Sequence, residues 1–233
     1  MLASLVLSIK RYTFRANDSR AAAADAEYRA LRPRVLEQQG YRCAFCRLVS
    51  KFQRGANKAA TNNEVHHVGK HDDNRYEMLK VACILCHAYH HVGETTKTGD
   101  VQAETLGGKS LIAYVPELSA VDVNNLQRVM GIALRDPDEK SVAEEIADHL
   151  IKRALPVKDV WGSFYPLDFA AAMSHLDDAE YESRAEPLED LRLVFNFAFL
   201  KDLAARLQEE TRWQVLPVSS WSSVARNHVG HSQ

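Results

Sequence analysis

Two closely spaced cysteine pairs carry the clearest chemistry in this sequence. They are Cys43-Ala-Phe-Cys46 and Cys83-Ile-Leu-Cys86, which are separated by 36 residues and include every cysteine of the chain. Each pair presents two thiolates from one tight turn, so two facing turns would complete the tetrahedral four-sulfur shell that zinc prefers. The spacing therefore predicts a structural zinc site, which is closed and has no open coordination position for catalysis.

Two other uses of the cysteines fit the pattern less well. Redox-active pairs would be typical beside a thioredoxin-like βαβ pattern, which the sequence does not show. Four buried apolar thiols would not favour paired spacing. Zinc remains the expected cofactor.

Histidines gather beside the cysteines and form a second candidate site. Residues 64–68 (EVHHV) alternate like a strand, which would place the adjacent His66 and His67 on opposite sides. His87 directly follows the last cysteine and His91 lies four residues later, so both would share one face of a helix. Imidazoles bind divalent metals and abstract protons near pH 7, but the same residues could also belong to a metal-stabilised fold without activity.

The elements that must position these residues are short and of mixed type. An Ala-rich helix is expected to reach Gly40, although Pro33 limits its uninterrupted length. Residues 5–14 suit a short strand, and so do residues 110–115. Ser119 should open a helix with the apolar stripe Leu126, Val129, Met130, Ala133 and Leu134. A last long helix is expected from near Pro187, with the stripe Leu191, Val194, Phe195, Ala198, Leu203 and Leu207.

Charge is distributed unevenly, although the net charge of the chain is only -2. Residues 1–60 contain 12 Lys and Arg against 4 Asp and Glu, whereas residues 99–233 contain 13 against 22. A basic front could bind nucleic acid, and surfaces of opposite charge could bind two protein partners. Solvated faces without a partner would give the same pattern.

The composition is that of a folded protein, with 46% apolar and 26% charged residues, which excludes disorder throughout. No apolar stretch approaches the ~20 residues that a membrane span needs. The first residues lack the charge and cleavage pattern of a signal peptide. We therefore expect a cytoplasmic protein.

The combination of CxxC, EVHH, CxxCH and HxxxH over residues 41–91 resembles the HNH, or ββα-metal, nuclease family with its zinc-ribbon elaboration. The resemblance implies that His67 is the general base, which would deprotonate a water that attacks a phosphodiester. It also implies a second divalent metal, held by His66, His87 and His91.

One position departs from the HNH pattern. The family has Asn five residues before the third zinc cysteine, where this chain has Met78. The side chain of Met78 cannot make the hydrogen bonds that brace the loop carrying the base. Asn74, four residues earlier, is a candidate replacement.

A second resemblance covers most of the chain. Residues 108–134 (GKSLIAYVPELSAVDVNNLQRVMGIAL) resemble the segment that follows the zinc module in the IcmJ, or DotN, family of type IVB (Dot/Icm) secretion proteins. YRCAFC at 41–46, the pair at 83 and 86 and, more loosely, residues 160–173 extend the likeness. This chain keeps EVHH and CHxxxH, which its secretion relatives largely lack.

The second resemblance implies a binding subunit rather than an enzyme. Members of that family have an HNH-like zinc fold and bind the type IV coupling ATPase at the inner membrane. With other coupling-complex subunits they build the platform that recruits secretion substrates, and related proteins belong to conjugative plasmid systems. The protein would then be recruited by the ATPase to the cytoplasmic face of the membrane. The alternative is a metal-dependent HNH endonuclease that cleaves DNA.

Together these observations predict an α+β protein in three parts. Residues 1–40 form an N-terminal strand and helix, residues 41–107 form an HNH-like ββα (treble-clef) zinc module, and residues 108–233 form a strand and a mostly helical region. Aromatic contacts with a partner could come from Trp161, Phe164, Tyr165, Phe195, Phe197 and Phe199, although their helical spacing favours the core for most of them. Among these, Phe197 is the best candidate for an exposed contact, because it lies off the apolar stripe.

Overall fold

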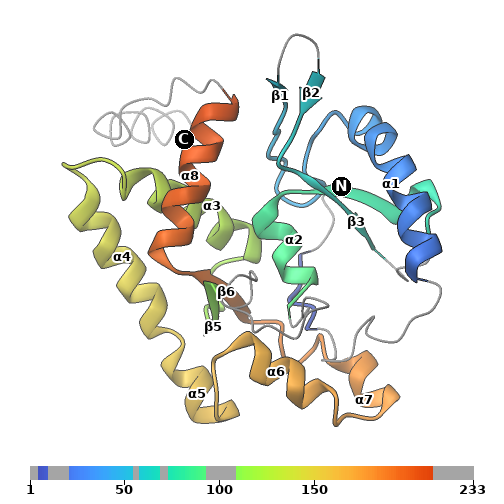
Figure 1. Ribbon diagram of the computed structural model, residues 1–233. Coiled ribbons are helices and arrows are strands. Elements are labelled where there is room, and N and C mark those ends of the chain that lie inside the picture. Colours follow the sequence, from blue (N-terminus) through green and yellow to red (C-terminus); the bar gives the residue numbers. More distant parts are fainter. Residues whose placement is uncertain (1–4, 10–20, 55–57, 69–72, 93–108, 212–233) are drawn as a thin grey trace, which may run out of the picture.

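A computed structural model describes residues 5–9, 21–54, 58–68, 73–92 and 109–211. Helices and three two-stranded antiparallel sheets make up this part of the chain, as expected for an α+β protein (Figure 1). No helix among these residues is both long enough and apolar enough to cross a membrane.

The cysteine-containing part combines helix α1 with short hairpins. Its elements are α1 (Ala21–Gln38), β1 (Phe52–Arg54), β2 (Lys58–Ala60), β3 (Glu64–His67), the 3-10 helix η1 (Tyr76–Met78), β4 (Leu79–Ala82) and α2 (Ile84–His90). Strand β1 pairs with β2, and β3 pairs with β4 in a register that sets Val65 opposite Val81. Gln39, just after α1, donates to the carbonyl of Leu79 (2.8 Å) and accepts from the amide of Val81 (2.9 Å). The end of α1 is thereby fixed to the outer edge of β4.

The first helix continues through Pro33, which the sequence marked as a limit. The helix can tolerate this proline because its inner face is held by packing: Val35 and Leu36 are buried against Val65, Leu79 and Val81. Gly40 follows the helix with a φ of 63°, the left-handed conformation in which glycine commonly ends a helix. The expected strand near the N-terminus is represented by one parallel bridge, between Ile9 and Val92. Residues 10–14 of that strand lie outside the described residues.

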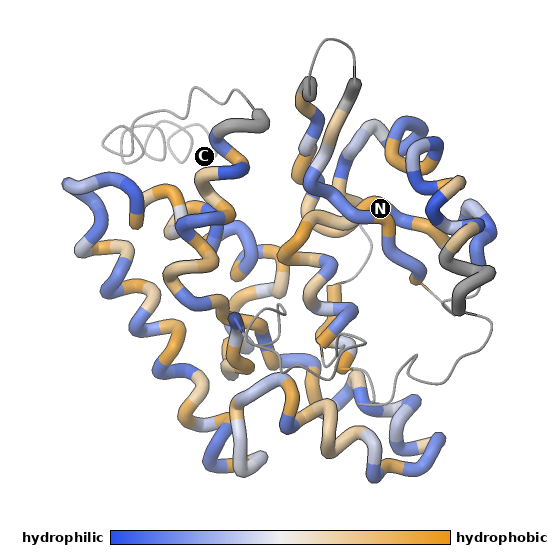
Figure 2. The backbone as a smooth tube through the Cα atoms, viewed as in Figure 1, coloured by the Kyte–Doolittle hydropathy of each residue, from blue (hydrophilic) through white to orange (hydrophobic). Residues whose placement is uncertain are grey.

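The second half surrounds a two-stranded antiparallel sheet with helices (Figure 1). Strands β5 (Ser110–Tyr114) and β6 (Leu191–Phe195) pair along their whole length. The helices are α3 (Ala120–Ala133), α4 (Lys140–Lys152), α5 (Leu155–Trp161), α6 (Pro166–Met173), α7 (Asp178–Ser183) and α8 (Phe197–Thr211). Figure 2 shows apolar and polar residues alternating along α4. This pattern is typical of a helix that packs one face on the core.

The prediction of one long helix from Pro187 is wrong, because its first apolar residues form strand β6. All five residues of β6 are buried, as is typical of a strand covered on both faces. Gln127 of α3 supplies hydrogen bonds along β6, donating to the carbonyl of Leu193 (3.0 Å) and accepting from the amide of Phe195 (2.7 Å). Helix α8 starts only at Phe197, after Asn196.

Helices α3 and α8 pack closely at Gly131. A Cβ atom at this position would lie 2.5 Å from the carbonyl oxygen of Leu200. Glycine therefore lets the two helices approach, which brings α3 over the sheet β5–β6 on one side and toward the cysteines on the other. The larger of two buried clusters contains residues of both halves, including Cys43, Cys83 and Cys86, whereas the cluster between α1, β3 and β4 is separate from it.

Candidate metal centres

The four cysteines come together as the spacing predicts. Their sulfur atoms all lie within 4.8 Å of one another, and Sγ of Cys46 is 3.6 Å from Sγ of Cys83. The first pair lies in a tight turn closed by the amide of Cys43 on the carbonyl of Leu48 (2.8 Å). Cys83 is the N-cap of α2, so the second pair occupies the first turn of that helix. Four convergent, largely buried thiols suit a tetrahedral metal ion, and they could hold zinc.

Helix α3 places a positive charge against this cluster. Arg128, only 9% exposed, donates to Sγ of Cys83 at 2.8 Å and to Sγ of Cys46 at 3.3 Å. Asn124, one turn earlier and fully buried, donates to Sγ of Cys86 at 3.5 Å. Four thiolates around a divalent cation leave a net charge of -2, and Arg128 offsets part of it. These two contacts connect the cysteine module to the helical half.

Burial and the contacts between Arg128 and the thiols shift the pKa values of these groups. Burial alone would lower the pKa of Arg128, but the neighbouring Cys83, Cys46 and Cys86 raise it above its usual range. Burial raises the pKa of the Cys83 thiol. Hydrogen bonds from Cys43 and the other two thiols hold the pKa of Cys46 well below that of a free cysteine. The cluster therefore favours thiolate at Cys46, the form in which cysteine binds a metal.

Three histidines form a second convergent group. The ligand nitrogens of His66, His87 and His91 all lie within 4.8 Å of one another, and Nδ1 of His66 is 3.2 Å from Nε2 of His91. His66 comes from β3 and is 3% exposed, whereas the other two come from α2 and the residue that ends it. His90 instead stacks on the ring of His66, with 4.2 Å between ring centroids. Three imidazoles at this spacing could hold one divalent transition metal.

His67 points to the other face of β3 and joins a short chain of hydrogen bonds. Its Nε2 is 2.8 Å from Oδ1 of Asn74, whose Nδ2 donates to Oε2 of Glu27 on α1 at 2.8 Å. The carboxylate can only accept, so it fixes the amide orientation of Asn74 and requires that Nε2 of His67 carry the proton. In the neutral form of the ring, Nδ1 of His67 would carry the lone pair, as a general base requires.

Met78 therefore does not leave His67 without a side-chain partner that holds its ring. Asn74 makes the side-chain contact with His67, and the carbonyl of Met78 accepts from the amide of Val68 (2.9 Å) just after the strand. A backbone carbonyl does not depend on the side chain at position 78. Glu27, Asn124 and Arg128 were not singled out by the sequence, since each acts on a residue at least 38 positions away.

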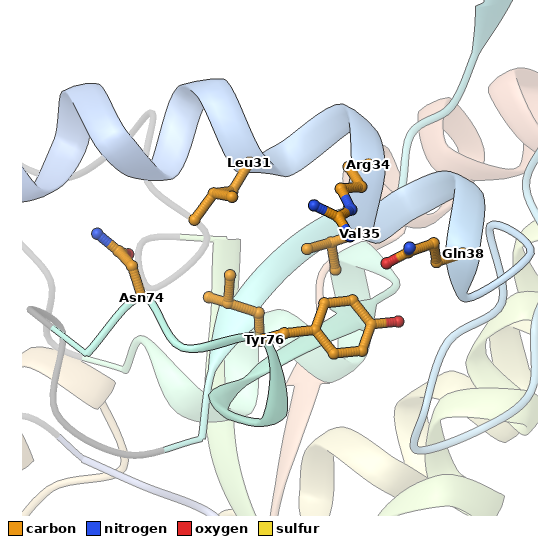
Figure 3. A pocket seen from close by; sticks show the side chains of 7 residues that line it. Leu31, Arg34, Val35, Gln38, Asn74 and Tyr76 are labelled. Carbon is orange, nitrogen blue, oxygen red and sulfur yellow. The ribbon is translucent and has the colours of Figure 1, made fainter.

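A pocket of about 430 Å³ lies between α1 and the η1–β4 segment, beside Asn74 (Figure 3). Figure 3 shows Leu31 and Val35 on one side and Tyr76 across from Arg34 and Gln38. The pocket thus borders the residue that braces His67, and it has one cationic side chain in its lining. No known protein family matches this sequence, and no curated protein sequence matches it.

Proposed function

We propose that this protein is a zinc-stabilised, HNH-like subunit of a type IVB secretion or conjugation coupling complex. In this proposal it binds the type IV coupling ATPase, helps to form the platform that recruits substrates, and performs no catalysis. The observation that carries the proposal is the position of Arg128 and Asn124, which contact the thiols of the cysteine cluster. Both lie in residues 108–134, the segment on which the family resemblance depends.

The contacts of that segment support a rigid frame with two dependent halves. Its strand β5 pairs with β6, and its helix α3 contacts α8, β6 and the cysteines at once. A closed four-cysteine site contributes to folding but not to chemistry. A rigid frame can present a fixed surface to a flexible partner, because it loses little conformational entropy of its own on binding.

The test is co-purification of the full chain with the cytoplasmic part of a type IV coupling ATPase from the same organism. We expect a stable complex for the wild type and for His67→Ala, and loss of the complex for Cys83→Ser. His149→Ala, at an exposed histidine of α4, is the matched control for His67→Ala. Absence of a complex with folded, zinc-loaded protein would contradict the proposal. Loss of assembly in His67→Ala alone, with the fold preserved, would move the interface to the histidine site.

A second candidate function is metal-dependent cleavage of DNA phosphodiester bonds. The observations that favour it are the three-histidine group and the hydrogen bond that orients His67, the next residue of β3 after His66. A divalent ion at His66, His87 and His91 would neutralise charge on the phosphate and the leaving oxygen. Nδ1 of His67 would accept the proton of the attacking water, while Asn74 holds the ring.

Plasmid nicking with added Mg2+, Mn2+, Ni2+ or Zn2+ tests this second function. Metal-dependent cutting that His67→Ala abolishes and His149→Ala preserves would establish a nuclease. No cutting by the folded protein with any of these ions would exclude it, and the histidines would then belong to the architecture alone.

A further inference from the structure

Large apolar side chains of β5 and α5 are exposed around one groove of the helical half. Of the aromatic residues that the sequence suggested as partner contacts, Phe195 is buried and Phe197 is half-buried against the core. Trp161 (42% exposed) and Tyr165 are exposed instead. Tyr114 of β5 and Val160 of α5 are also exposed and line the same groove as Trp161. Water contact over so much clustered apolar surface is unfavourable, and such a patch is typical of an interaction site.

This surface contains a defined groove of about 310 Å³. Its floor includes the buried Val157 and Leu191. One wall is α5, with Pro156, Val160 and Trp161, and the other is the turn that leads into β6, with Glu186, Pro187, Glu189 and Asp190. Tyr114 also lines it.

The charge of the groove has one sign. Glu186, Glu189 and Asp190 contribute three carboxylates, and no described residue of the lining is Lys or Arg. Within the described part of the chain, none of the three carboxylates forms an ion pair. Unpaired carboxylates beside an apolar floor repel an acidic partner and attract a cationic one.

The groove is already formed in the free protein. The ring of Trp161 packs on Phe169, with 5.4 Å between ring centroids, and α5 ends at Gly162 in the left-handed conformation (φ 79°). A hydrogen bond holds the acidic turn to the end of β5: the amide of Val115 donates to the carbonyl of Asp190 (3.0 Å). A preformed groove binds a partner without the loss of conformational entropy that ordering its walls would cause.

We propose that this groove is a docking site for an extended basic segment of a partner protein. Aliphatic side chains of the segment would lie on Val157, Val160 and Leu191. An Arg or Lys side chain would lie over the face of Trp161 and reach the carboxylates, a combination of cation–π and charge attraction. Docking of a basic segment in this groove does not require that the partner be the coupling ATPase.

Fluorescence anisotropy with the full chain tests the proposal. The probe is a fluorescein-labelled seven-residue peptide in which arginine alternates with leucine, and the comparison peptides replace Arg by Glu or Leu by Ser. We expect binding of the Arg-Leu peptide that is weakened by salt, weaker binding of the Arg-Ser peptide and no binding of the Glu-Leu peptide. Equal binding of all three, or of none, would overturn the proposal.

Two variants place the peptide in the groove. Trp161→Ala and the triple variant Glu186→Gln, Glu189→Gln, Asp190→Asn should each weaken binding about tenfold or more, as for the central residues of an interface. The control triple variant Glu145→Gln, Asp148→Asn, Glu182→Gln removes the same charge from exposed acids outside the groove lining and should bind as the wild type does. Equal losses in both triple variants would mean attraction by net charge only. Concentration-dependent self-association that Trp161→Ala abolishes would instead assign the groove to a second copy of the chain.

Discussion

Arg128 donates a 2.8 Å hydrogen bond to Sγ of Cys83, across 45 positions of sequence and between the two halves of the protein. The guanidinium is nearly buried, so its charge is not shared with bulk water. Its contact with a second sulfur, that of Cys46, means that both cysteine pairs depend on one residue of α3. The cysteine site and the helical half should therefore lose stability together.

Arg128→Met should destabilise the fold by ~3 kcal/mol, because removing one partner leaves buried charge uncompensated. Arg128→Lys should recover part of this, since it keeps the charge near the sulfurs but loses the hydrogen bond that Nη1 of Arg128 donates to Oδ1 of Asn125 (2.6 Å). Urea unfolding at fixed free zinc measures both. Arg135→Met, at the exposed end of the same helical segment, is the control and should change stability by less than ~0.5 kcal/mol. A melt of Arg128→Met equal to that of the control would contradict this account.

Cys83→Ser should release the metal and unfold the cysteine module, because structural zinc can contribute ~10 kcal/mol or more to the folding of small domains. Cys43→Ser should do the same. Elemental analysis should find one equivalent of zinc fewer than in the wild type. Circular dichroism should show a broader thermal transition at a lower temperature than that of the wild type. A cooperative melt unchanged by either substitution, or by chelator, would refute the zinc assignment.

Helix ends were predictable from the sequence where the type of a single residue determines the local backbone conformation. Ser119 caps α3 as expected, with its hydroxyl accepting from the amide of Asp122 (3.1 Å), and Gly40 ends α1. The convergence of four cysteines also followed from spacing, because each pair lies in one turn and one metal needs both pairs.

Helix α3 shows why the rest was not predictable. Its apolar pattern placed Val129 in the core, but Val129 is 43% exposed, whereas the polar Asn124, Gln127 and Arg128 are buried. Their burial is stable only because thiols and the edge of β6 accept or supply the hydrogen bonds. Those partners are distant in sequence, so the helix's own pattern does not contain them. The same holds for Leu191 and Val194, whose spacing suits a helix but whose pairing with β5 makes them a strand.

Gly131→Ala should destabilise the protein although alanine is the better helix former. The new methyl would meet the carbonyl oxygen of Leu200 at 2.5 Å, so α3 and α8 would have to move apart. Overpacking of this kind costs about 1–3 kcal/mol and outweighs the ~1 kcal/mol gain in helix propensity. Thermal unfolding measures the difference, with the exposed Val129→Ala as the control on the same helix. Stabilisation by Gly131→Ala would show that α3 and α8 can accommodate a Cβ atom at this position without moving apart.

The three-histidine group should bind a second metal equivalent. Titration of Co2+ into metal-free protein should give one intense thiolate charge-transfer band from the cysteine site and a second, weaker binding step. His66→Ala should remove the second step and keep the first, because it deletes the most buried of the three ligands. His149→Ala should keep both steps. A single step in the wild type would mean that the histidines contact one another without a metal.

His67 and Asn74 should be energetically coupled, because they share a 2.8 Å hydrogen bond that Glu27 orients. His67→Ala alone should cost only about 0.5–1.5 kcal/mol of stability, as for one hydrogen bond. In a double-mutant cycle with Asn74→Ala the two effects should be non-additive by at least ~0.5 kcal/mol. The comparison cycle pairs His67→Ala with Leu150→Ala on α4 and should be additive. If both cycles are additive, Asn74 does not position His67, and the case for a general base at this strand is lost.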